Sequence, residues 1–262
     1  MTVRPDLESH LTERRDAGRK LLLPYVTGGY PVKDWPRLIE GFAAAGADAI
    51  EIGIPFSDPV MDGPTIQEAS SIALSNGANP PAILDRVAQA DVDIPLIAMT
   101  YYNVAFRMGH KRFADALVTA GVGGAILPDL PLEEAADWAE EADRAGVATV
   151  MLAAPTGDDA RLARVAERSR GFVYGVGVVG ITGERAELSA SATEIATRLK
   201  AITSKPVVVG LGISTPAQAV EVAQIADGVV VASAIIRRML AGGSTDDAIE
   251  FVGELRKALD AS

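Results

Sequence analysis

The sequence has 262 residues, of which 48% are hydrophobic and 23% are charged, and its net charge is −11. This length fits two small domains or one barrel of about 250 residues. Nucleic acids and anionic membranes attract basic surfaces, so we expect neither as a partner of so acidic a chain. The absence of cysteine excludes disulfides and thiolate chemistry and fits a reducing, cytoplasmic setting.

Short apolar runs alternate with helical patterns along most of the chain. An amphipathic segment over 6–17 predicts an N-terminal helix. We expect eight strands, at 21–26, 49–54, 95–100, 124–127, 148–152, 172–176, 206–209 and 228–231. Helical patterns follow them at 33–45, 81–90, 110–120, 132–145, 159–168, 189–201, 215–225 and 245–260. Extra helices are expected at 64–75, after the second strand, and directly after the eighth strand.

The apolar runs are typical of parallel strands that helices cover on both faces. Eight strand–helix units in this length favour an α/β fold, a (β/α)8 TIM barrel that forms one domain over 1–262. It carries an extra N-terminal helix and extra helices after strands 2 and 8. The alternative is an open flavodoxin-like or Rossmann sheet. The glycine pattern of dinucleotide-binding sheets is missing after the first strand, where the sequence reads Thr27-Gly28-Gly29-Tyr30.

Three acids gather around the end of the second expected strand. Glu51 lies between Ile50 and Ile52. A carboxyl group in an apolar barrel mouth has a raised pKa and can exchange protons near neutral pH. The alternative for this residue is a structural glutamate paired with a polar neighbour. Asp58 and Asp62 follow in a proline-rich loop, where Asp58 fits a turn former and Asp62 fits a second, ionised carboxylate.

The loops after the last expected strands predict an anion site. Gly210-Leu-Gly-Ile-Ser follows the seventh strand, and Ala232-Ser-Ala with a short helix follows the eighth. In (β/α)8 barrels these two loops commonly bind phosphate, and glycines let backbone N–H groups approach it; ordinary turn glycines are the alternative. The glycine-rich loop after the sixth strand, over 175–183, is typical of a mobile lid. Asp129 also ends a strand, the fourth, and fits a helix cap, a supporting partner of the site or a reactant.

Other chemistries find little support in the sequence. No lysine follows a strand directly, which disfavours a Schiff-base aldolase. Two histidines and no cysteine make a metal site unexpected. The remaining reaction class is acid–base chemistry by carboxylates on a phosphorylated substrate. A phosphosugar isomerase on this fold is one alternative that these observations do not exclude.

The segment that starts at Glu51, reading Glu-Ile-Gly-Ile-Pro-Phe-Ser-Asp-Pro-Val-Met-Asp-Gly-Pro-Thr-Ile-Gln, resembles the signature of the tryptophan synthase alpha subunit family. Shorter matches follow the family order and begin at Pro24, Thr100, Leu127, Gly180 and Gly210. The resemblance implies a lyase of tryptophan biosynthesis. It would cleave indole-3-glycerol phosphate by a retro-aldol reaction to indole and glyceraldehyde 3-phosphate.

The resemblance also implies roles for individual residues. Glu51 would move protons at indole C3 and at the glycerol hydroxyl, and Asp62 would accept the indole N–H. The substrate pocket would be lined by Tyr25, Tyr101, Tyr174 and Thr182. The phosphate would be held by Gly183, Gly212, Ile213, Ala232 and Ser233. Tyr25 and Ala232 stand where phenylalanine and glycine are common in the family.

A partner protein is implied as well. Family members normally pair with a beta subunit in an alpha2-beta2 complex and pass indole to it through a tunnel. Pyridoxal phosphate belongs to that subunit, so no cofactor is expected in this chain. Two alternatives stay open: a free-standing indole-3-glycerol phosphate lyase without a beta partner, and a regulatory partner barrel that has lost catalysis. The presence of both Glu51 and Asp62 argues against the second alternative.

Overall fold

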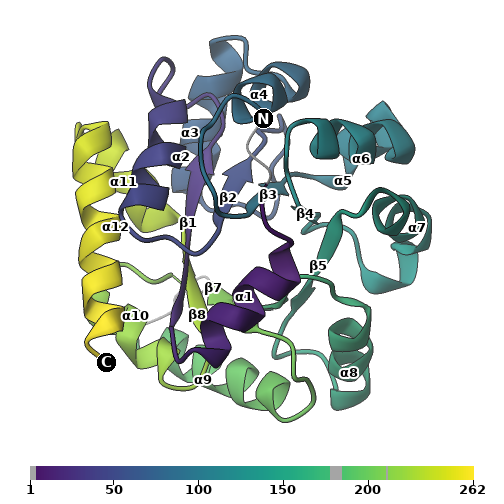
Figure 1. Ribbon diagram of the computed structural model, residues 1–262, viewed down its shortest axis with the longest axis vertical. Helices are drawn as coiled ribbons and strands as arrows, with labels where there is room; N and C mark the ends of the chain where they lie inside the picture. The colour runs from purple at the N-terminus through teal and green to yellow at the C-terminus, as the bar shows by residue number, and fades with distance from the viewer. Residues whose placement is uncertain (1–3, 178–184, 211) are drawn as a thin grey trace.

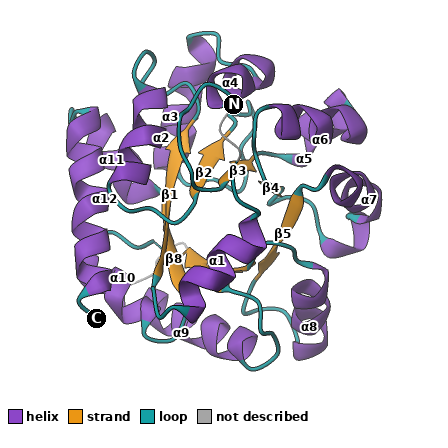
Figure 2. Cartoon of the chain, in the orientation of Figure 1, coloured by secondary structure: helices purple, strands orange, loops and turns teal. Residues whose placement is uncertain are grey.

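The computed structural model of the chain describes residues 4–177, 185–210 and 212–262. In this part of the chain, eight parallel strands close into a barrel in sequence order (Figures 1 and 2). The closed barrel confirms the predicted (β/α)8 fold and excludes the open sheet. The strands are β1 Leu21–Thr27, β2 Ile50–Gly53, β3 Leu96–Met99, β4 Gly124–Ile126, β5 Ala148–Ala153, β6 Val173–Val176, β7 Val207–Gly210 and β8 Gly228–Val231.

Helices surround the barrel, as Figure 2 shows. The extra helices expected at the N-terminus, after β2 and after β8 are present as α1, α3 and α11. None of the helices in the described ranges is long and apolar enough to cross a membrane. The helices are α1 Leu7–Asp16, α2 Trp35–Ala44, α3 Pro64–Ser75, α4 Pro80–Val87, α5 Tyr102–Met108, α6 His110–Thr119, α7 Ala136–Ala145, α8 Asp159–Arg168, α9 Arg185–Lys200, α10 Pro216–Ala223, α11 Ser233–Leu240 and α12 Thr245–Asp260, with the short 3-10 helix Leu132–Glu134 before α7.

The sequence pattern does not predict α5, which follows β3 directly. Its first residue, Tyr102, donates its backbone N–H to Asp129 Oδ1 at 2.7 Å. A carboxylate that accepts from the first turn of a helix satisfies a free N–H and stabilises that helix end. Asp129 lies in the loop after β4, so the cap comes from a distant part of the chain. Asp129 therefore acts as a helix cap, one of the three roles expected for it.

Apolar side chains fill both sides of the sheet. One buried cluster packs between the strands and the surrounding helices. A second cluster fills the barrel interior, and its members in the strands or directly before them include Leu21, Leu23, Ala49, Ile97, Ile126, Val150, Phe172, Val208 and Val230. Side chains alternate along a strand, so Glu51 points to the same side as Ala49, into the barrel.

The helix α1 closes the N-terminal end of the barrel. Figure 1 shows it lying across the barrel opening. Its Leu7 and Leu11 are fully buried and belong to the interior cluster. A Cβ atom at Gly124 or Gly171 would lie 2.7 or 2.6 Å from Leu7 Cδ2, so glycine is required there for close packing. Both glycines stand where strands begin, so any open site must lie at the C-terminal end.

Acids next to the N-terminal ends of the strands are fully bonded. Asp48, just before β2, is completely buried and accepts from Leu22 N at 2.9 Å and from Arg19 Nε at 2.6 Å. Arg256 of α12 lies 3.3 Å from the same carboxylate. Asp227, just before β8, accepts from the backbone N–H of the first β7 residue at 2.8 Å. These carboxylates join neighbouring strands to each other and to outer helices, which is a structural role.

Asp48→Ala should strongly destabilise the fold, because the buried Leu22 N–H loses its acceptor and the buried Arg256 loses one partner of its ion pairs. Removing one partner of a buried ion pair costs about 3–5 kcal/mol. Urea unfolding should show a loss of this size. Asp260→Ala is the control: Asp260 contacts the same arginine at 2.6 Å but is about half exposed, so its loss should be below about 1 kcal/mol. Equal, small losses in both variants would contradict this assignment.

Candidate active site

Glu51 is an unpaired carboxyl group inside the barrel. In β2 it pairs in register with Tyr25 of β1 and Ile97 of β3, and it is 1% exposed. Neither carboxyl oxygen has a hydrogen-bond partner among the described residues. Burial without a partner disfavours the charged form and raises the pKa of Glu51 to about 8. The group is therefore mostly protonated at neutral pH and can give up its proton without a large change in pH.

Two tyrosines, Tyr25 and Tyr174, lie beside Glu51, and the hydroxyl of each is close to a glycine. A Cβ at Gly53 would lie 1.8 Å from the Tyr25 hydroxyl, and a Cβ at Gly210 would lie 2.4 Å from the Tyr174 hydroxyl. Gly53 is the last residue of β2 and Gly210 is the last residue of β7. Because neither glycine has a side chain, the two tyrosine hydroxyls can occupy that space at the C-terminal mouth. Burial raises the pKa of both tyrosines, and the nearby Glu51 charge adds to that rise. Both therefore stay neutral.

Asp62 is the second acid of the mouth, in the loop after β2. Its backbone is held by hydrogen bonds to Pro59 O at 3.0 Å and from Gln67 Nε2 at 2.8 Å. Partial burial raises the pKa of Asp62 to about 6, and a hydrogen bond with Tyr101 acts in the opposite direction. Asp62 is thus ionised at neutral pH while Glu51 is protonated. Two carboxyl groups in different states suit an acid–base pair with separate roles.

Tyr101 holds the Asp62 loop in place. Its hydroxyl accepts the backbone N–H of Met61 at 2.8 Å. Its ring stacks on Phe56 of the same loop, with ring centroids 5.3 Å apart. Asp58, in contrast, is exposed and accepts from the hydroxyl of Ser57 at 2.6 Å. This local contact is the behaviour expected of a turn former.

A hollow of about 230 Å³ connects Asp62 to the loops after β7 and β8. Its lining contains five of the sites expected from sequence besides Asp62: Tyr174, Gly212, Ile213, Ala232 and Ser233. Glu51 and Tyr25 lie deeper in the barrel, and Tyr101 supports the loop from the side. Thr182 and Gly183 lie outside the described residues.

The far end of this hollow is suited to an anion. Ser233 opens α11, and no side chain caps the helix at Ala232. The first N–H groups of a helix lack partners within it and carry a partial positive charge, so they bind phosphate readily. Gly212 has φ +54°, a left-handed conformation that favours glycine. Ser214, next in the loop, donates its backbone N–H to Gln218 at 2.9 Å, which fixes the loop.

Among the lining residues that sequence reasoning did not assign to the site, Arg237 is the charged one, and it stands in the middle of α11. Its distance of four residues from Ser233 is the signal that could have found it, because such residues share a helix face. In the described part of the chain, no three acidic or histidine side chains come together as metal ligands. The fold and the site thus define a (β/α)8 barrel with two carboxyl groups and an anion-binding end at one mouth.

Comparison with known proteins identifies the family. The sequence matches the family profile described as tryptophan synthase alpha chain over residues 11–259. The tryptophan synthase alpha chain of Streptomyces coelicolor is 43% identical over 257 residues, which cover 97% of this chain and 94% of that protein. That of Geobacter sulfurreducens is 44% identical over 253 residues, covering 94% of this chain and 96% of that protein.

Comparison with solved structures gives the same family. The tryptophan synthase subunit alpha of Legionella pneumophila superposes with a TM-score of 0.88 at 32% identity, covering 98% of both chains. A tryptophan synthase structure from Mycobacterium tuberculosis gives a TM-score of 0.89 at 36% identity, also over 98% of both chains. The chain belongs to the tryptophan synthase alpha chain family. It is a lyase that cleaves indole-3-glycerol phosphate in tryptophan biosynthesis.

Glu51→Gln should stabilise the fold increasingly as pH rises. Burial raises the pKa of Glu51 from 4.5 to about 8, so between these pH values the unfolded chain releases a proton that the folded chain keeps. The free energy of unfolding therefore falls with rising pH over this range, and the glutamine variant escapes that loss. Urea unfolding of both proteins between about pH 5 and about pH 8 should show the gap widen by a few kcal/mol. A gap independent of pH would refute the buried, neutral state.

Proposed function

We propose that Glu51 and Asp62 divide the chemistry of the retro-aldol cleavage between them. The observation that carries this proposal is the different surroundings of two carboxyl groups at one mouth: Glu51 is fully buried without a hydrogen-bond partner among the described residues, whereas Asp62 is partly buried. Burial raises the pKa of Glu51 to about 8 and that of Asp62 to about 6. A protonated Glu51 can supply a proton at neutral pH, and an ionised Asp62 can accept a hydrogen bond and balance positive charge.

The reaction breaks the bond between indole C3 and the adjoining glycerol carbon. Glu51 gives its proton to C3, which places positive charge on the ring and its nitrogen. Asp62 accepts the ring N–H and stabilises that charge. The Glu51 carboxylate then takes the hydroxyl proton of the glycerol carbon, which becomes the aldehyde as the bond electrons restore the aromatic ring. Glu51 ends the cycle protonated, so no proton is gained or lost.

The rest of the mouth would hold the substrate at both ends. Tyr25, Tyr101 and Tyr174 would line the indole pocket, where their neutral, buried rings suit an aromatic ligand. The phosphate would lie at the start of α11, with N–H groups from Gly212, Ile213, Ala232 and Ser233. Thr182, as a contact of Asp62, and Gly183, as a phosphate contact, rest on the family resemblance alone.

We also propose that the chain acts as one domain over 1–262, in the cytoplasm, beside a tryptophan synthase beta subunit. That subunit would hold the pyridoxal phosphate, and this chain would need no cofactor. Exposed apolar side chains next to the mouth support a partner there: Val60 is 81%, Met61 59% and Phe106 62% exposed. Exposed apolar groups near one opening are typical of an interaction surface.

Glu51→Gln should lower the rate of indole formation by at least ~10²-fold, the usual scale for a lost general acid–base group, with KM little changed. Asp62→Asn should also reduce kcat strongly, because a neutral amide cannot balance developing positive charge. Asp58→Asn is the control and should stay near the original rate, since Asp58 is an exposed turn residue. A near-normal rate for Glu51→Gln would overturn the proposed mechanism.

A beta subunit should bind this chain and increase its rate of indole formation. Phe106→Ser should weaken that complex by about 10-fold, the effect of losing one buried aromatic contact. Val118→Ser is the control, because Val118 is similarly exposed but adjoins Arg4 and Pro5 near the N-terminal end of the barrel. Full indole formation without a beta subunit, and no binding when one is added, would favour a free-standing lyase.

A further inference from the structure

The hollow beside Asp62 contains a cation that the proposed mechanism does not use. Arg237, in the middle of α11, lines it together with Gly212 and Ser233. Among the described residues of that lining, it is the only one with a positive charge. Its side chain is exposed, so a guanidinium group there does not bear the cost of full burial.

The geometry of α11 directs this arginine toward the helix N-terminus. Ser233 and Arg237 are four residues apart and so lie one above the other on the same helix face. Side chains of a helix slant toward its N-terminus, so the guanidinium extends toward the first turn. The N-terminal N–H groups, which no side chain caps at Ala232, face the same space.

Arg237 also has no competing partner. No hydrogen bond or ion pair engages its guanidinium within the described part of the chain. Its neighbour Arg238 is held in place, since it donates to Ala234 O at 3.1 Å and lies 3.4 Å above the Phe251 ring. In an acidic chain of net charge −11, an arginine left free at a ligand-sized hollow is available for an anion.

We propose that Arg237 binds the phosphate group of the substrate, adding a full positive charge to the neutral backbone amides of α11. This inference rests on the proposed function, because it places the phosphate at the start of that helix. A phosphate ester carries close to two negative charges above about pH 6, and a guanidinium matches its oxygens with two parallel hydrogen bonds. Arg237 would thus select phosphorylated over unphosphorylated indole-glycerol ligands.

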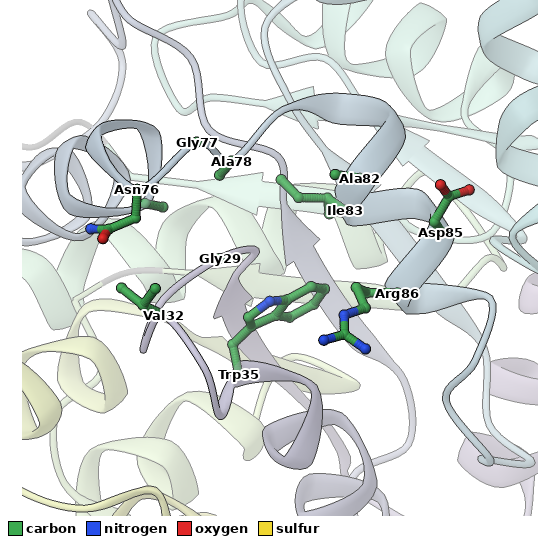
Figure 3. A pocket seen from close by; sticks show the side chains of 11 residues that line it. Gly29, Val32, Trp35, Asn76, Gly77, Ala78, Ala82, Ile83, Asp85 and Arg86 are labelled. Carbon is green, nitrogen blue, oxygen red and sulfur yellow. The ribbon is translucent and has the colours of Figure 1, made fainter.

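A matched control is available elsewhere in the chain. Arg86, in the last turn of α4, is likewise exposed and engages no partner among the described residues. It lines a separate hollow of about 310 Å³ beside Trp35 and Ile83, shown in Figure 3. That hollow shares no lining residue with the one beside Asp62. Arg86→Gln therefore removes the same charge from the protein without touching the phosphate end.

The test compares Arg237→Gln, Arg237→Lys and Arg86→Gln with the unaltered chain. Inorganic phosphate binding, followed by NMR titration, should weaken about 10-fold in Arg237→Gln, the effect of one lost charge-assisted contact. KM for indole-3-glycerol phosphate should rise by a similar factor with kcat within about 2-fold. Arg237→Lys should recover part of the affinity, since it restores the charge but not the paired hydrogen bonds. Arg86→Gln should match the unaltered chain.

Salt gives an independent readout. Added NaCl should raise KM less steeply in Arg237→Gln than in the unaltered chain, because screening acts on the missing charge. Unchanged phosphate binding and KM in Arg237→Gln, or a fall in kcat at constant KM, would overturn the inference while leaving the proposed function intact. If Glu51→Gln keeps a near-normal rate while Arg237→Gln loses phosphate affinity, the proposed division of the chemistry fails and the arginine assignment stands.

Discussion

The carboxyl group of Glu51 is buried and has no hydrogen-bond partner among the described residues. The cost of burying a charge there constrains the residues around it. A buried carboxylate with no hydrogen bonds is costly, so the group is kept neutral and its pKa rises to about 8. The neighbouring groups are compatible with a neutral Glu51. Tyr25 and Tyr174 remain neutral as well, and Gly53 and Gly210 give their hydroxyls room. The proposed reactivity comes from keeping an ionisable carboxyl group buried without a hydrogen bond.

At the N-terminal end of the barrel, buried carboxyl groups have hydrogen-bond and ion-pair partners. Asp48 is as buried as Glu51, yet it accepts a backbone N–H and contacts three arginines. Asp227 likewise accepts a backbone N–H and contacts Lys200 at 2.7 Å. Full bonding makes these acids structural, and the leucines of α1 keep water from that end. Stability and reactivity are thus separated along the barrel axis, as expected for a (β/α)8 enzyme.

Sequence patterns predicted what depends on local or repeated features. The eight apolar runs gave the strands, because each is buried on both faces whatever its neighbours are. The acidic segment from Glu51 to Asp62 placed both acids, because one strand and its loop carry them. The helix α5 could not be predicted, since its cap, Asp129, comes from another loop. Whether Glu51 has a hydrogen-bond partner depends on the side chains that the other strands place in the barrel interior. No single segment of the sequence contains that information.

The ligand that fits this mouth is polarised, and the two charged side chains along the hollow follow that polarity. In the proposed binding mode, the indole end becomes positive during cleavage and meets the ionised Asp62. In the same mode, the phosphate end is a dianion and meets Arg237 with the N-terminus of α11. A chain of net charge −11 repels a dianion at long range, so a free cation at the entrance also offsets that repulsion locally. Reversing the ligand would place like charges together at both ends, so in the proposed mode this charge repulsion sets the orientation that brings indole C3 toward Glu51.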